Sequence, residues 1–295
     1  MRPNKAYQTL NLKILILGSM LALFLLFVLR STFSSSSLAK ASTSDDHHMH
    51  DEIIQEKSSD TIRDCNSLAC NKIPSSLAQA LIHYSTSTIT PQQTLKEISV
   101  TARVLEKKSP CNFLVFGLGH DSLMWSSLNH GGRTVFLEED EAWIEQIKHR
   151  FPMLESYHVS YESKVNEAEK LMEIGRGSEC RRVRDPRHSM CPLALKGFPR
   201  EVYETKWDLI MVDAPTGYHE DAPGRMTAIY TAGMMARNID RGEIDVFVHD
   251  VNREVEDKFS MEFLCEKYMK TQEGRLRHFT IPSHMDDLDR PFCPE

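Results

Sequence analysis

The sequence predicts an α/β domain with a mostly parallel sheet and helices on both of its faces. Short apolar runs of the length of buried strands alternate with helical patterns along most of the chain. The first two runs enclose a glycine turn, and carboxylates follow several runs at the point where the strand ends. This alternation is typical of a sheet whose crossover helices cover it from both sides.

The first strand–helix–strand unit carries the strongest pattern. A strand at 113–116 is followed by Gly117-Leu118-Gly119, and Asp121-Ser122 gives an N-cap signal for a helix. The second strand, at 134–137, ends on Glu138, 21 positions after Gly117. This order is the first half of a nucleotide-binding βαβ unit, in which the glycines admit a ligand to the backbone and the acid accepts ribose hydroxyls.

The residues of the turn favour one class of nucleotide cofactor. Dinucleotide folds require a third glycine where this chain has Ser122, and a pyrophosphate is bound at a helix N-terminus that carries no acid. Asp121 places a carboxylate there, which suits an ammonium group such as the amino-acid end of S-adenosylmethionine. We therefore expect S-adenosylmethionine rather than a nicotinamide cofactor, with a plain βαβ unit around a tight turn as the alternative.

Two later strands end on further polar side chains. The run 207–215 is apolar up to Asp213, and the run 246–252 contains His249 and Asp250. Open parallel sheets bind ligands outside the carboxyl ends of their strands. We therefore expect Glu138, Asp213 and Asp250 to converge on one crevice.

A short third strand is expected at 156–159. Tyr161 follows it, either as a contact for adenine or as a residue that packs on a helix end. A sixth strand is expected at 275–281, and no clear seventh strand is visible. Helices are expected at 75–84, 90–105, 142–150, 163–173, 223–237 and 255–270, with Pro91 at the start of the second; the first two should mainly pack against the sheet.

The N-terminal part predicts export. Residues 14–29 are an uncharged apolar run preceded by Arg2, Lys5 and Lys13, which favours a cytosolic N-terminus and a short membrane span. The expected organisation is a cytosolic tail at 1–13, a transmembrane signal anchor at 14–30, a flexible luminal stem at 31–70 and a catalytic domain at 71–295. A cleaved signal peptide, with Ala39-Lys40-Ala41 as the site, is the alternative.

Charge and cysteine content add further limits. The formal net charge of −7 argues against a nucleic-acid binder. Five arginines gather between Arg176 and Arg187, either as a solvated loop or as a contact for an anionic polymer. Seven cysteines in an exported chain permit disulfides, with Cys65/Cys70 and Cys180/Cys191 as the first pairs to test and at least one cysteine left over.

Several of these motifs together resemble one family. The runs FGLGHDSLMW, GGRTVFLEEDEAWI, WDLIMVDAPTGYHEDAPGRM, DVFVHDVNR, RLRHFTIPSH and RPFCP are similar to those of the plant glucuronoxylan 4-O-methyltransferases, Golgi proteins of polysaccharide biosynthesis. The resemblance covers roughly residue 71 to the C-terminus. It implies a Rossmann-like class I S-adenosylmethionine-dependent methyltransferase that methylates O4 of glucuronic acid on xylan. Two alternatives stay open: the same chemistry on arabinogalactan, and a non-catalytic accessory factor of xylan synthesis.

The resemblance also implies a location and partners. We expect a single-pass type II protein of the Golgi membrane, held by its N-terminal anchor, with the catalytic domain in the lumen. The expected partners are glucuronoxylan, the Golgi membrane and other enzymes of xylan biosynthesis, and no nucleic acid.

Roles for individual residues follow from the resemblance and from the chemistry. Gly117, Gly119 and Asp121 would bind the methionine end of the cofactor and Glu138 its ribose. Asp213 would lie beside the reacting centre as the base for the acceptor hydroxyl, with His249 as the other candidate and Asp250 in the same catalytic set.

Two further predictions concern charge. Arginine suits a uronate carboxylate, and Arg225 is the first choice and Arg253 the second, with a surface salt bridge as the alternative for Arg225. Oxygen ligands from Asp213, Asp250 and Asn252 are compatible with Mg²⁺. A divalent cation is nevertheless not favoured, because the spacing is Asp-x-Asn and Arg253 follows directly.

Overall fold

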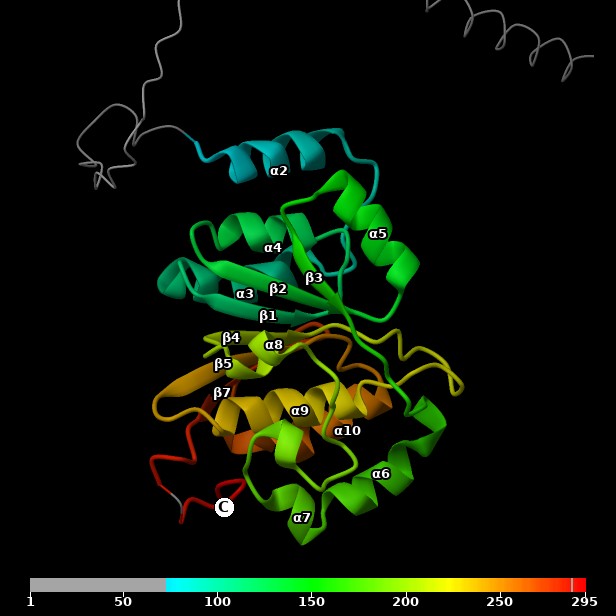
Figure 1. Ribbon diagram of the computed structural model, residues 1–295, viewed down its shortest axis with the longest axis vertical. Helices are drawn as coiled ribbons and strands as arrows, with labels where there is room; N and C mark the ends of the chain where they lie inside the picture. Colours follow the sequence, from blue (N-terminus) through cyan, green and yellow to red (C-terminus); the bar gives the residue numbers. More distant parts are fainter. Residues whose placement is uncertain (1–72, 288) are drawn as a thin grey trace, which may run out of the picture. The chain divides into compact units, whose positions relative to one another are not determined.

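The computed structural model describes residues 73–287 and 289–295. One seven-stranded sheet lies at its centre, in the order β3-β2-β1-β4-β5-β7-β6 (Figure 1). The first five strands pair in parallel, whereas β7 is antiparallel to β5 and to β6. The predicted mostly parallel sheet is confirmed. The strands are β1 (Asn112–Phe116), β2 (Arg133–Glu138), β3 (Glu155–His158), β4 (Leu209–Val212), β5 (Glu243–Val248), β6 (Met269–Glu273) and β7 (Leu276–Pro282).

Helices cover both faces of the sheet, as predicted. Alternate residues of β1 point to opposite sides: Leu114 and Phe116 join one buried cluster, and Phe113 and Val115 join the other. The first cluster includes α6 (Ala168–Gly175), α7 (Ser178–Arg181), α8 (Arg200–Glu204), α9 (Met226–Arg237) and α10 (Glu254–Ser260). The second includes α3 (Leu95–Lys108), α4 (Ser122–Leu128) and α5 (Glu141–Arg150), while α2 (Ser75–Thr86) packs on α4.

The second helix begins later than predicted. Its N-cap is Thr94, and Pro91 lies outside it. The Thr94 side chain accepts a hydrogen bond from the backbone N–H of Glu97, whose carboxylate accepts one from the backbone N–H of Thr94 at 2.6 Å. This capping box satisfies two backbone donors at the helix end, so it fixes the start of α3 more strongly than the proline does.

The predicted helix at 255–270 is wrong beyond Ser260. A π-helical turn, Met261–Cys265, and a 3₁₀ turn, Glu266–Tyr268, follow α10, and the chain then enters β6. The inner residues of β6 are exposed and polar. An edge strand of this kind has no apolar alternation, which is why the sequence showed no seventh strand.

Two disulfides are present in the described residues. Cys180–Cys191 confirms one predicted pair, whereas Cys265–Cys293 was not predicted. Cys111 is a buried free cysteine, and Cys65 and Cys70 lie outside the described residues. Closing the 28-residue segment between Cys265 and Cys293 stabilises the fold by about 3 to 4 kcal/mol in the chain-entropy account.

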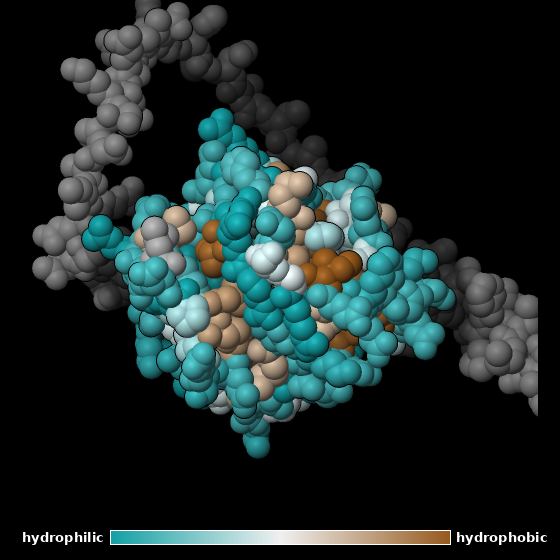
Figure 2. Space-filling view, turned by 90° about the horizontal axis from the view of Figure 1, so that it is seen from below, coloured by the Kyte–Doolittle hydropathy of each residue, from teal (hydrophilic) through white to brown (hydrophobic). Residues whose placement is uncertain are grey.

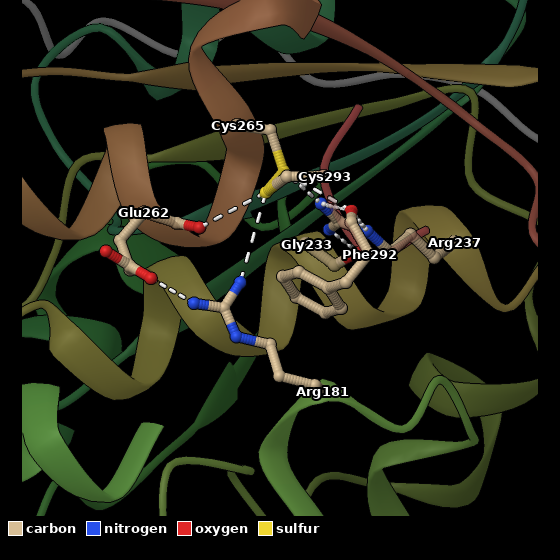
Figure 3. Close-up of a disulfide and its surroundings, with 7 residues drawn as sticks. All are labelled: Arg181, Gly233, Arg237, Glu262, Cys265, Phe292 and Cys293. Atoms are coloured by element: carbon tan, nitrogen blue, oxygen red, sulfur yellow. Dashed lines mark hydrogen bonds and ion pairs between the residues drawn. A yellow bond between two sulfur atoms is a disulfide. The ribbon is translucent and has the colours of Figure 1, made fainter. Parts of the chain in front are cut away.

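Side chains around the second disulfide also hold the C-terminal segment (Figure 3). Arg237 on α9 donates to the carbonyl of Phe292 at 3.2 Å and to that of Gly233 at 2.9 Å. The Phe292 ring lies 4.1 Å from the guanidinium carbon of Arg237 and 4.7 Å from that of Arg181. Burial lowers the pKa of Arg237 to about 9. The last residues are therefore held against α9 as an irregular segment, and they do not form a strand.

Within the described residues, no helix has both the length and the apolar character that a membrane span requires. The predicted tail at 1–13, the anchor at 14–30 and the stem at 31–70 all lie outside the described residues. The face of the molecule seen in Figure 2 is mostly hydrophilic and is interrupted by hydrophobic patches.

Candidate functional site

A cavity of about 470 Å³ opens at the carboxyl ends of β1, β2 and β4. Its lining combines residues that the sequence assigned to separate roles, and the predicted meeting of Glu138 and Asp213 in one crevice is confirmed. Asp250 lies behind this lining and is ion-paired with two of its residues, Arg225 and Arg253. The sequence-predicted residues in the lining are Gly117, Gly119, Asp121, Glu138, Asp213, Arg225 and Arg253.

The glycine turn allows the backbone to approach the cavity closely. Gly117 has φ +121°, and a Cβ there would lie 3.3 Å from the Cβ of Ala214. A Cβ on Gly119 would lie 2.8 Å from Oδ1 of Asp121. Tyr84 of α2 holds the turn from outside, because its hydroxyl donates to the carbonyl of His120 at 2.7 Å. The prediction that the first helix mainly packs was therefore incomplete.

Asp121 occupies the predicted N-cap position of α4 but does not cap the helix with its side chain. Its carboxylate accepts from Nε1 of Trp125 at 2.8 Å, and the Ser122 hydroxyl accepts from the backbone N–H of Gly119 at 2.9 Å. Burial, followed by the charge of Asp213, raises the pKa of Asp121 to about 6. The Asp121 carboxylate is therefore fixed at the cavity wall, and a cationic partner would stabilise its ionised form.

Glu138 is held in place by backbone donors. Its Oε2 accepts from the N–H of Leu118 at 2.9 Å, and its Oε1 accepts from those of Glu139 and Asp140 at 3.0 and 3.1 Å. A carboxylate has about four lone-pair sites, so acceptor capacity remains for ligand hydroxyls. Burial raises the pKa of Glu138 above its ordinary value.

Tyr161 lies outside the cavity lining. Its ring packs against the cluster that includes α9, and its buried hydroxyl has no hydrogen-bond partner among the residues at 73–287 and 289–295. Burial, with Glu139 and Glu138 nearby, raises its pKa well above the ordinary value. A contact between Tyr161 and adenine remains a prediction.

Asp213 is held by three side chains from distant segments of the chain, Gln93, Arg225 and His249. His249 Nδ1 lies 2.9 Å from its Oδ1, and because an ionised carboxylate only accepts, Nδ1 carries the proton. Gln93 Nε2 donates to its Oδ2 at 3.1 Å, and Arg225 Nη1 lies 3.4 Å from Oδ1. Burial raises the pKa of Asp213, but the His249 hydrogen bond and the Arg225 charge outweigh it and hold that pKa below the ordinary value.

His249 connects Asp213 to a residue that sequence reasoning missed. The imidazole is fully buried, and its Nε2 faces Oε2 of Glu97 at 3.9 Å. Glu97 is itself buried and accepts backbone hydrogen bonds from Thr94 and Arg275, each at 2.6 Å. The Thr94-x-x-Glu97 spacing was the available signal, because it predicts a capping box, but it gave no hint of His249.

Asp250 organises three arginines rather than lining the cavity. It is buried, with φ +61°, and contacts Arg225 Nη2 at 3.1 Å, Arg253 Nη2 at 2.8 Å and Arg275 Nη1 at 2.8 Å. A direct catalytic role for Asp250 remains a prediction. The geometry gives it a positioning role, because it orients two guanidinium groups that reach the lining.

The two predicted substrate-binding arginines differ in exposure. The Arg225 side chain is 3% exposed and donates to the carbonyls of Pro215 and His249 at 2.8 and 3.1 Å, so its interpretation as a surface salt bridge is wrong. The Arg253 side chain is 29% exposed and donates to the carbonyl of Thr216 at 2.9 Å. Arg225 is enclosed by the protein, whereas Arg253 faces the opening.

Asp213, His249 and Asp250 also have the composition of a cation site. One potential ligand atom from each lies within 4.8 Å of the others. Arg225 contacts both carboxylates, however, so a divalent cation there would compete with a guanidinium group. Asn252, the third oxygen ligand considered from sequence, is exposed. The prediction that a cation is not favoured remains untested.

The arginines at 176–187 are mostly engaged in contacts within the protein. Arg176 and Arg181 pair with Glu262, and Arg187 pairs with Asp185 at 2.7 Å. Arg182 lies 3.8 Å from Glu179, and Arg184 donates to the carbonyl of His188 at 3.4 Å. These partners neutralise much of the local positive charge, so the contacts favour a structural loop over a polymer-binding patch.

Comparison with known proteins places the chain among named relatives. It is 67% identical to glucuronoxylan 4-O-methyltransferase 1 of Arabidopsis thaliana over 100% of both chains. It is 61% identical to glucuronoxylan 4-O-methyltransferase 3 of the same plant, over 98% of this chain and 97% of the relative. Arabinogalactan O-methyltransferase 2, also from Arabidopsis thaliana, is 50% identical over 73% of this chain and 77% of its own length.

The profile of the family described as IRX15/IRX15L/GXM matches residues 96–279, which include the cavity lining except for Pro91 and Gln92. The relatives that match the full length of the chain are methyltransferases by name, and the sheet has the mostly parallel form with helices on both faces that the sequence predicted for a class I methyltransferase. This chain belongs to the IRX15/IRX15L/GXM family.

Proposed function

We propose that this protein is an S-adenosylmethionine-dependent methyltransferase that methylates O4 of glucuronic acid side chains on glucuronoxylan. The observation that carries this conclusion is the 67% identity, over the full length of both chains, to glucuronoxylan 4-O-methyltransferase 1. The cavity agrees with it, because a glycine turn, a ribose-type acid and a buried carboxylate meet in one lining.

The cavity residues fit the proposed cofactor. A Cβ at Gly117 would press on Ala214 and one at Gly119 on Asp121, so a larger residue at either position would disturb the lining. Asp121 would hold the ammonium group of the methionine end, and Glu138 would accept from the ribose hydroxyls. The volume of about 470 Å³ lies within the range of small-molecule sites. When bound, S-adenosylmethionine supplies a methyl group activated by a sulfonium.

Asp213 is the proposed base for the acceptor hydroxyl. A sugar hydroxyl is a weak acid, so a group within hydrogen-bond reach must take its proton during attack. The lowered pKa keeps Asp213 ionised at neutral pH and able to accept. Its bonds to His249 and Gln93 fix the direction of the carboxylate, which aligns the acceptor oxygen for an in-line transfer.

Arg253 is the better placed of the two arginines for the uronate. Both line the cavity, but Arg225 donates to two backbone carbonyls and is 3% exposed, whereas Arg253 is 29% exposed. The carboxylate of the acceptor would therefore meet Arg253, and Arg225 would act by holding Asp213, Asp250 and the backbone around them.

Transfer to glucuronic acid of arabinogalactan is the second candidate. It is motivated by the 50% identity to arabinogalactan O-methyltransferase 2, and the higher identity and longer overlap with the glucuronoxylan enzymes favour glucuronoxylan. A non-catalytic accessory role is disfavoured by the intact glycine turn and acids.

The proposed location is the Golgi membrane, with residues 14–30 as the anchor and the domain in the lumen. Other xylan-synthesising enzymes in the lumen are the proposed partners.

Incubation of the full chain with labelled S-adenosylmethionine and each polymer tests the function. We expect label on O4 of glucuronic acid in glucuronoxylan and much less in arabinogalactan. Label only in arabinogalactan would favour the second candidate, and no label together with no binding of S-adenosylhomocysteine would favour the accessory role.

Protease protection of a tagged chain in sealed Golgi vesicles tests the location. Digestion of the domain in intact vesicles would contradict it.

A further inference from the structure

The turn between β4 and α9 presents an exposed aromatic ring at the cavity. Tyr218 lines the cavity and is 71% exposed, although it is a large side chain with an apolar ring. Among the described residues, the Tyr218 ring makes an edge contact with His219, at 4.7 Å between ring centroids. An aromatic ring that lines a polar cavity while staying open to solvent offers an apolar face to a ligand.

The backbone around Tyr218 is fixed on both sides. The N–H of Thr216 donates to Oε1 of Glu139 at 3.2 Å, and its carbonyl accepts from Arg253 at 2.9 Å. The N–H of Gly217 donates to the carbonyl of Pro223 at 3.0 Å. Gly217 has φ +59°, and a Cβ there would lie 3.1 Å from a carboxylate oxygen of the buried Glu256. The position of Tyr218 is therefore set by the fold.

Arg253 lines the same cavity as Tyr218 and keeps part of its hydrogen-bonding capacity free. Arg253 Nη1 bonds to Thr216 in the same turn, and Nη2 lies 2.8 Å from Asp250. A guanidinium group has five N–H donors in a planar fork. Nη1 also lies 3.7 Å from Oε1 of Glu256, so Nε and the second hydrogen of Nη2 remain for a ligand. The same two contacts hold the fork in place, which lowers the entropy cost of binding a carboxylate.

From these positions we infer that Tyr218 and Arg253 form the acceptor subsite for a uronic acid sugar. The apolar face of the pyranose ring would stack on Tyr218, and the carboxylate would bind Arg253. This inference rests on the proposed function and deepens it, because it adds a specificity residue on the turn that joins Asp213 to α9. The proposed subsite recognises two features of the acceptor, the face of the sugar ring and the charge of its carboxylate.

Substitutions in the full chain separate the two contacts. Tyr218→Ala should raise KM for glucuronoxylan on the order of tenfold, because it removes the aromatic face on which the sugar ring would stack. Tyr218→Phe keeps the stacking face and should keep KM near wild type. Arg253→Met should abolish the preference for glucuronoxylan over the same polymer with its carboxyl groups reduced to alcohols. His219→Ala is the matched control, because His219 is adjacent but is not in the lining.

Affinity for S-adenosylhomocysteine, measured by calorimetry, should stay near wild type in Tyr218→Ala. An unchanged KM in that variant would overturn the inference, and so would a large loss of S-adenosylhomocysteine affinity, which would assign Tyr218 to the cofactor. If the proposed function is wrong, the wild-type chain itself will transfer no methyl group, which distinguishes that outcome from a failure of the subsite inference alone. Direct binding of glucuronoxylan then decides: weaker binding by Tyr218→Ala supports the subsite, and no binding by wild type overturns it.

Discussion

The two halves of the cavity are built in different ways. The half at β1 and β2 comes from one continuous stretch, in which Gly117, Gly119, Asp121 and Glu138 follow one another within a single strand–helix–strand unit. The half at β4 and β5 gathers side chains from distant segments around Asp213 and His249. Local backbone shape determines the first half, and a buried network of charges determines the second.

This difference implies different consequences of substitution. A change in the first half should act on cofactor affinity, because its residues shape the space beside the backbone. A change in the second half should act on turnover and leave the cofactor bound, because its residues hold and orient one carboxylate.

The largest effect is expected at the centre of the second half. Asp213→Asn should lower kcat on the order of 1,000-fold, since an amide cannot take the acceptor proton. Affinity for S-adenosylhomocysteine should stay near wild type. Asp208→Asn, at the opposite end of the same strand, is the matched control for folding. Unchanged turnover in Asp213→Asn would remove this residue from the mechanism.

In the first half, Gly119→Val should weaken binding of S-adenosylhomocysteine on the order of 100-fold. The added side chain would collide with Asp121, whose Oδ1 already lies 2.8 Å from the position of a Cβ. Calorimetry measures the loss, and a thermal melt in the absence of ligand shows whether the fold survives. Wild-type affinity in this variant would mean that the cofactor binds elsewhere.

A smaller effect on turnover is expected from Glu97→Gln. The amide removes the charge that faces His249 and one of two charge-assisted backbone acceptors, so kcat should fall on the order of tenfold. Glu106→Gln, on the exposed side of the same helix, should have no effect. Equal activity of the two variants would show that the Glu97 charge has no part in orienting the His249–Asp213 pair.

The smallest effect is a pH dependence of cofactor affinity. The pKa of Asp121 is about 6, so its carboxylate is ionised above that pH and protonated below it. An ammonium group binds the ionised form, and affinity for S-adenosylhomocysteine should therefore be constant above pH 7 and fall by up to about tenfold per unit below pH 6. Asp121→Asn should bind weakly at every pH, and a wild-type profile that stays flat down to pH 5 would contradict this role.

The same contrast explains how much of the molecule could be predicted from the sequence. Glycines and acids at fixed spacing after apolar runs report on local backbone geometry, so the first half of the site and the five parallel strands could be recognised. Strand β6 could not, because an exposed polar edge leaves no hydrophobic pattern. The end of α10 at Ser260 was missed for a different reason, because the π-helical turn that follows it buries Phe263, Leu264 and Cys265 and so continues the apolar pattern of the helix.

The network around Asp213 depends on contacts between distant segments. Gln93 and Glu97 fall within the helix predicted at 90–105, and Arg275 lies at the start of the predicted sixth strand. No local signal joins these residues to Asp213, His249 or Asp250. The sequence suggested that Arg225 was available to bind the substrate. Its burial results from the packing of α9 against the sheet, which the local sequence does not show. The Cys265–Cys293 pair was missed because its loop contains three elements and a reversal of the chain.

The most direct test is a crystal structure of the full chain with S-adenosylhomocysteine and a xylo-oligosaccharide that carries glucuronic acid. The account predicts the amino-acid end of the ligand at Asp121, its ribose at Glu138, and the acceptor O4 within hydrogen-bond reach of Asp213. A ligand bound in another pocket, or an acceptor hydroxyl directed away from Asp213, would contradict it.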